Sequence, residues 1–265
     1  MKNTFTLALF LSLWNVCIAQ DHHFFDSFDG TKIAYQDMGK GQPVILLHGF
    51  ISNGTSWNGT ALTKKLQDHG YRLIIPDLRG NGKSDRSHDP SKYAEDAEIK
   101  DMVALANHLN LSEYRAVGYS RGSIVLAKLL TQEDRITQAV IGGMGIDFSN
   151  PEWDRRIMFA EAFGGRAPLN EITEGAVSYA KSVGADLEIL SLLQTYQPVT
   201  SKAELGQIDT SVLVIAGDQD TDNGDPAALH QALPNSQLVI VPGDHNTTYR
   251  TEPFAQEVLK YFNEN

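Results

Sequence analysis

Short, mostly apolar runs that alternate with helix-like segments constrain the fold of this chain more than any other feature. The runs are 44–47, 72–75, 115–119, 137–142, 211–216 and 237–241. Continuous apolar runs of this length are typical of strands that are buried on both faces of a sheet. When such strands are joined through helices, they form parallel βαβ units with helices on both faces. The sequence therefore predicts one α/β unit around a parallel sheet.

The amino-terminal part of the sheet follows a different pattern. Asp29-Gly30 separates two short strand-like runs, and this dipeptide is a strong signal for a hairpin turn. The hairpin predicts an antiparallel start to the sheet. Together, these patterns predict an α/β fold with a mostly parallel eight-stranded sheet that is flanked by helices.

The strand pattern is interrupted in residues 146–208, where three helical patterns occur instead. We expect this segment to form a helical cap that is inserted after strand 6. The α/β core is then expected to comprise 20–145 and 209–265. Aromatic residues in the cap either pack it onto the core or line a substrate pocket, and packing is the simpler expectation for any single one. These are Trp153, Phe159, Phe163, Tyr179 and Tyr196.

Residues 1–19 have the composition of a secretory signal peptide. Lys2 is followed by an almost wholly apolar stretch, and small residues at Cys17 and Ala19 precede the polar Gln20. The stretch is too short to span a bilayer comfortably. A buried amino-terminal helix is the alternative. We expect cleavage after Ala19, no membrane span in the mature protein, and a periplasmic or secreted location in a bacterial source.

Composition excludes several classes of function. The 265 residues are 42% hydrophobic and 21% charged, which is typical of a globular protein. Cys17 is the only cysteine and lies in the segment expected to be removed, so a disulfide framework and a cysteine nucleophile are excluded. The formal net charge of -11 makes nucleic acid and anionic membranes poor partners. We expect a small-molecule acyl substrate and no cofactor, and the oligomeric state is open.

A G-x-S-x-G pattern at 118–122 lies between a strand-like run and a helix-like run. A sharp turn from strand to helix strains the residue at the turn, and flanking glycines remove Cβ atoms that would clash there. Ser120 would then project alone, with the backbone N–H of Arg121 at the positive end of the helix. Such patterns also occur by chance, as ordinary glycine-rich turns. The strand-turn-helix context favours a nucleophile.

Five motifs follow one another in the order of a known family. They are 41–50 (GQPVILLHGF), 77–84 (DLRGNGKS), 118–122 (GYSRG), 217–220 (GDQD) and 243–245 (GDH). In this order they resemble the α/β-hydrolase fold family, and the resemblance covers nearly all of the chain after the amino-terminal segment. The resemblance implies a nucleophile, then an acid, then a histidine along the chain. It does not define the reaction, because this fold hosts many reactions.

The resemblance implies a catalytic triad of Ser120, Asp220 and His245. A serine hydroxyl is a weak nucleophile that needs an adjacent base, and the base needs a carboxylate that holds its tautomer. Asp220 ends the G-x-x-D pattern in which the family places its acid. Asp218 is the second candidate for the acid and Asp147 is a remote third.

The backbone N–H groups of Phe50 and Arg121 are the expected oxyanion hole, worth about 3 kcal/mol per donor in the transition state. The side chain of Arg121 has no assigned role. The alternating aspartates from Asp218 onward also suggest a calcium loop. An EF-hand loop, however, requires glycine where Asn223 stands and glutamate where Leu229 stands, so we expect no metal.

These residues predict an exported serine hydrolase that cleaves a carboxylic ester or a similar small acyl compound through an acyl-enzyme. The same triad could instead serve carbon–carbon bond hydrolysis, lactone opening or cofactor-free perhydrolysis. A non-catalytic ligand-binding protein on a hydrolase scaffold is the third interpretation. Epoxide hydrolases and haloalkane dehalogenases are disfavoured because those families place aspartate where Ser120 stands.

Overall fold

The computed structural model describes residues 22–264. The predicted signal peptide lies outside these residues, so its cleavage and the export of the protein stay predictions. Within the described part of the chain, no helix is long and apolar enough to cross a membrane.

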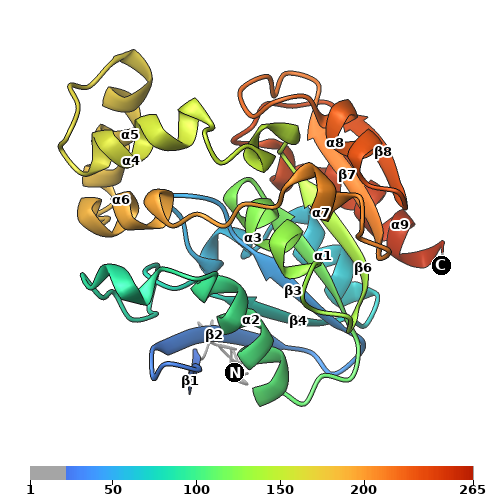
Figure 1. Cartoon of the computed structure of the whole chain (residues 1–265). Coiled ribbons are helices and arrows are strands. Elements are labelled where there is room, and N and C mark those ends of the chain that lie inside the picture. The colour runs from blue at the N-terminus through green and yellow to red at the C-terminus, as the bar shows by residue number, and fades with distance from the viewer. Residues whose placement is uncertain (1–21, 265) are drawn as a thin grey trace, which may run out of the picture.

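The described strands form one eight-stranded sheet with the order β1-β2-β4-β3-β5-β6-β7-β8 (Figure 1). The β1–β2 and β2–β4 pairs are antiparallel, and all the other pairs are parallel. This confirms the predicted mostly parallel sheet with an antiparallel start. The strands are β1 (His23–Asp26), β2 (Lys32–Met38), β3 (Pro43–Leu47), β4 (Arg72–Pro76), β5 (Tyr114–Tyr119), β6 (Ile136–Gly142), β7 (Ser211–Gly217) and β8 (Ser236–Val241).

Helices cover both faces of the sheet, as expected of a parallel sheet. Side chains of α2, α3 and α8 join one apolar cluster with the sheet, and those of α1 and α9 join a second cluster on the opposite face. The helices are α1 (Ala61–Asp68), α2 (Ala97–His108), α3 (Arg121–Leu129), α4 (Asp154–Phe163), α5 (Glu171–Ser182), α6 (Leu187–Thr195), α7 (Lys202–Leu205), α8 (Pro226–Ala232) and α9 (Glu252–Asn263).

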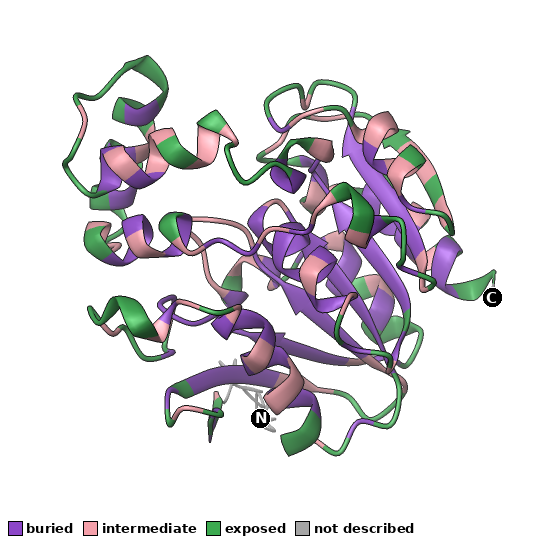
Figure 2. Ribbon diagram, in the orientation of Figure 1, coloured by how far each residue is buried: buried purple, intermediate pink, exposed green. Residues whose placement is uncertain are grey.

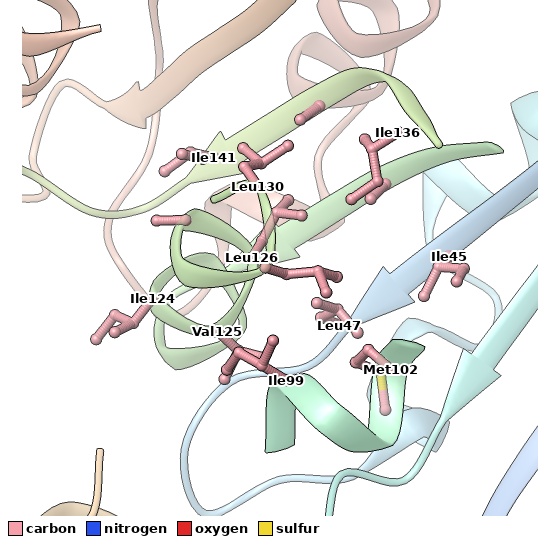
Figure 3. Close-up of a cluster of buried hydrophobic side chains, with 14 of the residues drawn as sticks. Ile45, Leu47, Ile99, Met102, Ile124, Val125, Leu126, Leu130, Ile136 and Ile141 are labelled. Atoms are coloured by element: carbon pink, nitrogen blue, oxygen red, sulfur yellow. The ribbon is translucent and has the colours of Figure 1, made fainter. Parts of the chain in front are cut away.

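The core lies between the central strands and these helices. In Figure 3, Leu126 of α3 and Met102 of α2 are drawn with Ile45 and Leu47 of β3, and all four side chains are fully buried. Figure 2 shows the central strands buried along their length, whereas the edge strand β8 is partly exposed. The central strands therefore form a rigid base for the loops that follow them.

Helices α4 to α7 lie between β6 and β7 in the chain, and Figure 1 shows α4, α5 and α6 together at one side of the molecule. Helices α4, α5 and α6 have an apolar cluster of their own, which includes Phe163, Val177 and Leu193, and Tyr93 of the core joins it. Leu205 of α7 belongs instead to the cluster that contains α2, α3 and α8. The sequence patterns predicted α4, α5 and α6 but not α7. Because α7 has only four residues, it is too short to show a helical period.

A buried arginine joins three distant segments of the core. The Arg79 guanidinium lies 2.6 Å and 2.9 Å from the two carboxylate oxygens of Asp101 in α2, and 2.8 Å from Asp29 in the β1–β2 hairpin. Only 1% of the Arg79 side chain and none of Asp101 is exposed. Burial alone would lower the pKa of Arg79, but the hydrogen bonds to Asp101 and Asp29 outweigh it and raise that pKa.

We expect Arg79→Met to lower the free energy of unfolding by about 3–5 kcal/mol, because it leaves the buried Asp101 carboxylate without its charged partner. Urea denaturation followed by circular dichroism measures this change. Lys32→Met is the control, since it breaks the exposed Lys32–Asp26 pair and is expected to shift the midpoint little. Equal midpoints for the two variants would contradict the structural role of Arg79.

Candidate active site

Ser120 lies at the sharp turn between β5 and α3, with φ of 54° and ψ of -124°. This combination of a positive φ and a negative ψ is unusual for a residue with a side chain. The flanking glycines allow it: a Cβ atom at Gly118 would lie 2.4 Å from the carbonyl oxygen of Gly122, and one at Gly122 would lie 2.3 Å from that of Leu47. The strained strand-turn-helix geometry expected at this motif is therefore present.

His245 follows β8 and reaches the serine from the far end of the chain. Its Nε2 atom lies 2.9 Å from the Ser120 hydroxyl oxygen, and its Nδ1 atom lies 2.7 Å from Oδ2 of Asp220. A carboxylate can only accept, so Nδ1–H donates to Asp220 and Nε2 is left to accept the serine proton. The structure thus brings the three predicted residues into one hydrogen-bonded chain.

The two other aspartates considered for the acid have different partners. The Asp218 carboxylate accepts a hydrogen bond from the backbone N–H of Gly243 at 3.0 Å and so holds the loop that carries His245. Asp147 lies beside Gly224, where an added Cβ atom would be 2.7 Å from its Cγ. Only 3% of the Asp220 side chain is exposed. Of the three aspartates, the structure places Asp220 against the histidine.

Two residues for which no role in catalysis was predicted contact His245. The Asn223 amide nitrogen lies 3.0 Å from Nδ1 of His245 and 3.4 Å from Oδ1 of Asp220. Tyr119, in the second position of the G-x-S-x-G motif, donates its hydroxyl to the backbone carbonyl of His245 at 2.8 Å. Burial raises the pKa of Tyr119, so it stays a donor. For Tyr119, its position next to the nucleophile was the one signal in the sequence that could have predicted this contact. For Asn223, no such signal was available.

The two predicted oxyanion donors flank Ser120. Arg121 begins α3, where the first N–H groups have no partner within the helix, and Phe50 lies in the loop after β3. No hydrogen bond among residues 22–264 uses either backbone N–H. A Cβ atom at Gly49 would be 3.4 Å from Cβ of Ser120. The loop after β3 therefore runs directly beside the serine.

His48 holds this loop in place. Its Nε2 atom accepts the backbone N–H of Leu78 at 3.0 Å, so its proton lies on Nδ1, which donates to the Gly49 carbonyl at 2.8 Å. Burial lowers the pKa of His48, which favours this neutral tautomer. His48 thus positions the oxyanion loop rather than exchanging protons.

The Arg121 side chain points into the protein and links the elbow to two helices. It forms two hydrogen bonds of 2.7 Å and 2.6 Å with Glu98 of α2 and a third of 3.1 Å with the Leu193 carbonyl of α6. Only 3% of Arg121 is exposed. Its side chain therefore fastens the inserted helices to the catalytic turn, a role that the sequence left unassigned.

Two cavities meet at Ser120 and His245. We call them the larger lobe, of about 760 Å³, and the smaller lobe, of about 390 Å³. Loops after β3 and β4 border the larger lobe, whereas α3 and α4 border the smaller one, and α5 contributes to both. Of the cap aromatics, Trp153, Phe159 and Tyr179 line the lobes, and Phe163 packs in the apolar cluster. Aromatic residues of the inserted segment therefore both pack in the apolar cluster and line the lobes, and Phe159 does both.

No group of three or more histidine, cysteine, aspartate or glutamate side chains within residues 22–264 could hold a metal ion. The aspartates of the loop after β7 have separate partners, as described above for Asp218 and Asp220.

Comparisons with known proteins agree with this geometry. A family profile described as alpha/beta hydrolase fold matches residues 42–163. A protein of Synechocystis sp. with the provisional name non-heme chloroperoxidase is 31% identical over 243 residues, which cover 80% of this chain and 87% of the relative. A non-heme chloroperoxidase of Kitasatospora aureofaciens is 25% identical over 89% of this chain and 97% of its own. Epoxide hydrolases match over shorter stretches.

Solved structures share the fold at lower identity. A thermophilic esterase from Thermogutta terrifontis superposes with a TM-score of 0.74 at 22% identity, covering 92% of this chain and 98% of that chain. By its sequence similarity and its architecture, the chain belongs to the α/β-hydrolase fold family.

Proposed function

We propose that this protein is a serine hydrolase that cleaves a carboxylic ester or a similar small acyl compound. The observation that carries the proposal is the hydrogen-bonded chain from Ser120 through His245 to Asp220, with contacts of 2.9 Å and 2.7 Å. These distances suit a base that takes the serine proton while a carboxylate fixes its tautomer. Structural neighbours include proteins named as esterases.

The mechanism follows from this arrangement. The Ser120 oxygen attacks the carbonyl carbon while Nε2 of His245 takes its proton. The negative charge that forms on the carbonyl oxygen is stabilised by the N–H groups of Phe50 and Arg121, about 3 kcal/mol for each donor. His245 then gives its proton to the leaving alcohol. Water, activated by the same histidine, releases the acid and restores Ser120.

A second candidate function uses the same acyl-enzyme. Relatives that match most of this chain are named non-heme chloroperoxidases. If hydrogen peroxide replaced water in the second step, its oxygen would attack the acyl carbon, and the products would be a peracid and free Ser120. Adding hydrogen peroxide to the ester assay and measuring the peracid tests this reaction.

Reaction of the purified protein with a fluorophosphonate tests the proposed function directly. We expect one adduct, on the peptide that contains Ser120, because the probe phosphonylates a serine that is activated by a base. Mass spectrometry of the digested protein locates the adduct. A folded protein that remains unlabelled would contradict the proposal and favour a non-catalytic, ligand-binding role.

We also propose that the protein is exported, as the sequence of residues 1–19 indicates. The intact mass of protein recovered from the periplasm or the medium of expressing cells tests this proposal. An intact mass that corresponds to a chain beginning at Gln20 would support export, and a full-length chain retained in the cytoplasm would contradict it.

A further inference from the structure

Three arginine side chains contribute to the wall of the smaller lobe, and no acidic side chain does. They are Arg121, Arg155 and Arg156, and apolar residues of α3 and α4 line the same wall. The protein as a whole has a formal net charge of -11. A wall of this charge, directly beside the proposed nucleophile, is therefore unlike the average surface of the molecule.

Arg155 and Arg156 differ from Arg121 because their charges are not neutralised. Glu98 pairs with Arg121 at 2.6 Å, whereas neither Arg155 nor Arg156 forms an ion pair with any residue in 22–264. The Arg155 guanidinium lies over the ring of Phe159, 5.0 Å from its centroid, and Phe159 lines the same lobe. Arg156 donates to the Pro151 carbonyl. Both residues are half-buried, and their two positive charges have no ion-pair partner at this cavity.

The position of these arginines does not stabilise the helix that carries them. Both lie in the first turn of α4, where the helix dipole disfavours positive charge. The residue that precedes the helix, Trp153, provides no side-chain hydrogen bond to cap it. The first turn also holds Asp154, which is exposed and forms no ion pair with either arginine. The helix N–H groups and the two guanidinium groups therefore still reinforce one another, and a negative group in the cavity would relieve this repulsion.

The larger lobe also has two arginines, but we expect them to attract an anion less strongly. Arg86 and Arg250 are exposed to solvent, where water and salt screen their charge. Asp186 contributes a carboxylate to the same wall. An anion would therefore be held more strongly in the smaller lobe, where the arginines are half-buried and no carboxylate opposes them.

We propose that the smaller lobe binds a carboxylate group of the substrate, so that this hydrolase prefers small esters that are negatively charged. The inference rests on the proposed function of Ser120, because it concerns the same site. The apolar residues of the lobe, Ile124 and Met144 among them, would contact the short carbon chain between the carboxylate and the ester. Arg155 and Arg156 determine the preference for a charged ester, whereas the triad determines whether any ester is cleaved.

Matched pairs of esters that differ in one charge test this preference. The first pair places the charge on the acyl half: 4-nitrophenyl hydrogen glutarate and its neutral methyl ester. The second pair places it on the alcohol half: 4-acetoxybenzoate and its methyl ester. We expect kcat/KM to favour the charged member of one pair by about tenfold, the value of one good charge-assisted contact. The pair that responds identifies which half of the ester occupies the lobe.

The variant Arg155→Gln/Arg156→Gln assigns the preference to the lobe. We expect it to lower the ratio of kcat/KM for the charged and neutral esters about tenfold. Arg166→Gln/Lys181→Gln is the matched control, since it removes the same charge from the same inserted segment, and neither residue lines a lobe. This control is expected to keep the ratio. Rates from the Ser120→Ala protein are subtracted to remove spontaneous hydrolysis.

Several outcomes would overturn the inference. No preference in either pair would do so, and Ser120-dependent turnover of the neutral esters would still support the hydrolase. Loss of the preference in Arg86→Gln/Arg250→Gln alone would place the anion in the larger lobe instead.

If no ester is turned over, titration calorimetry of monomethyl glutarate with the Ser120→Ala protein still tests whether the smaller lobe binds a carboxylate. Binding that is lost in Arg155→Gln/Arg156→Gln would support the anion site, and no binding would refute it.

Discussion

The Ser120→Ala variant is expected to lose ester hydrolysis almost completely, with kcat for 4-nitrophenyl butyrate reduced about 10⁵–10⁶-fold. The change removes the attacking oxygen, and the His245 Nε2 atom, now 2.9 Å from that oxygen, is left without a proton to accept. What remains is the catalysis that the oxyanion donors and binding supply without a nucleophile. Release of 4-nitrophenolate measures both the wild-type rate and the residual rate.

Ser123→Ala is the matched control for this variant. Ser123 lies one turn from Ser120 at the start of α3 and is buried, and its hydroxyl exchanges hydrogen bonds of 2.8 Å and 2.9 Å with the backbone of Gly142. Its loss should cost about 1 kcal/mol of stability and keep the nucleophile. Both variants should retain the wild-type circular dichroism spectrum. Turnover that persists in folded Ser120→Ala protein would contradict the assignment of the nucleophile.

The elements of this fold could be predicted from the sequence because burial leaves a local pattern. The buried run 44–47 became β3, and the helical patterns of the inserted segment became α4 to α6. The ends of helices were less predictable where unusual backbone angles determine them. Helix α2, for example, begins only at Ala97, because Glu95 and Asp96 just before it both have φ of 55° and a helix cannot continue through them.

The site could be predicted only as far as motif order determines it. Parallel strands bring their carboxyl ends to one edge of the sheet, so residues that follow β5, β7 and β8 were expected to meet. The partners of Arg121 could not be predicted in this way. Glu98 and the Leu193 carbonyl lie 23 and 72 positions away, and no local period relates them. The charge of the smaller lobe likewise depends on how α4 is placed over the sheet.

The assignment of Asp220 rather than Asp218 as the acid has a large and testable consequence. Asp220→Asn is expected to lower kcat about 10⁴-fold, because an amide in this place can donate to Nδ1 of His245 and so hold the proton on Nε2, the wrong tautomer for a base. Asn223 would favour the same wrong tautomer, since its amide nitrogen already lies 3.0 Å from Nδ1 and can donate to it. Steady-state hydrolysis of 4-nitrophenyl butyrate measures the loss.

Asp218→Asn provides the contrast, since it makes the same change of charge two positions away. The Asp218 carboxylate accepts only the Gly243 N–H among the described hydrogen bonds, and an asparagine oxygen can accept the same bond. We therefore expect this variant to keep kcat within a few-fold of the wild type. The reverse result, a collapse of kcat in Asp218→Asn with activity retained in Asp220→Asn, would move the acid to Asp218. It would also require the loop after β7 to rearrange, because Asp218 now faces the turn before His245 and Asp220 faces its imidazole.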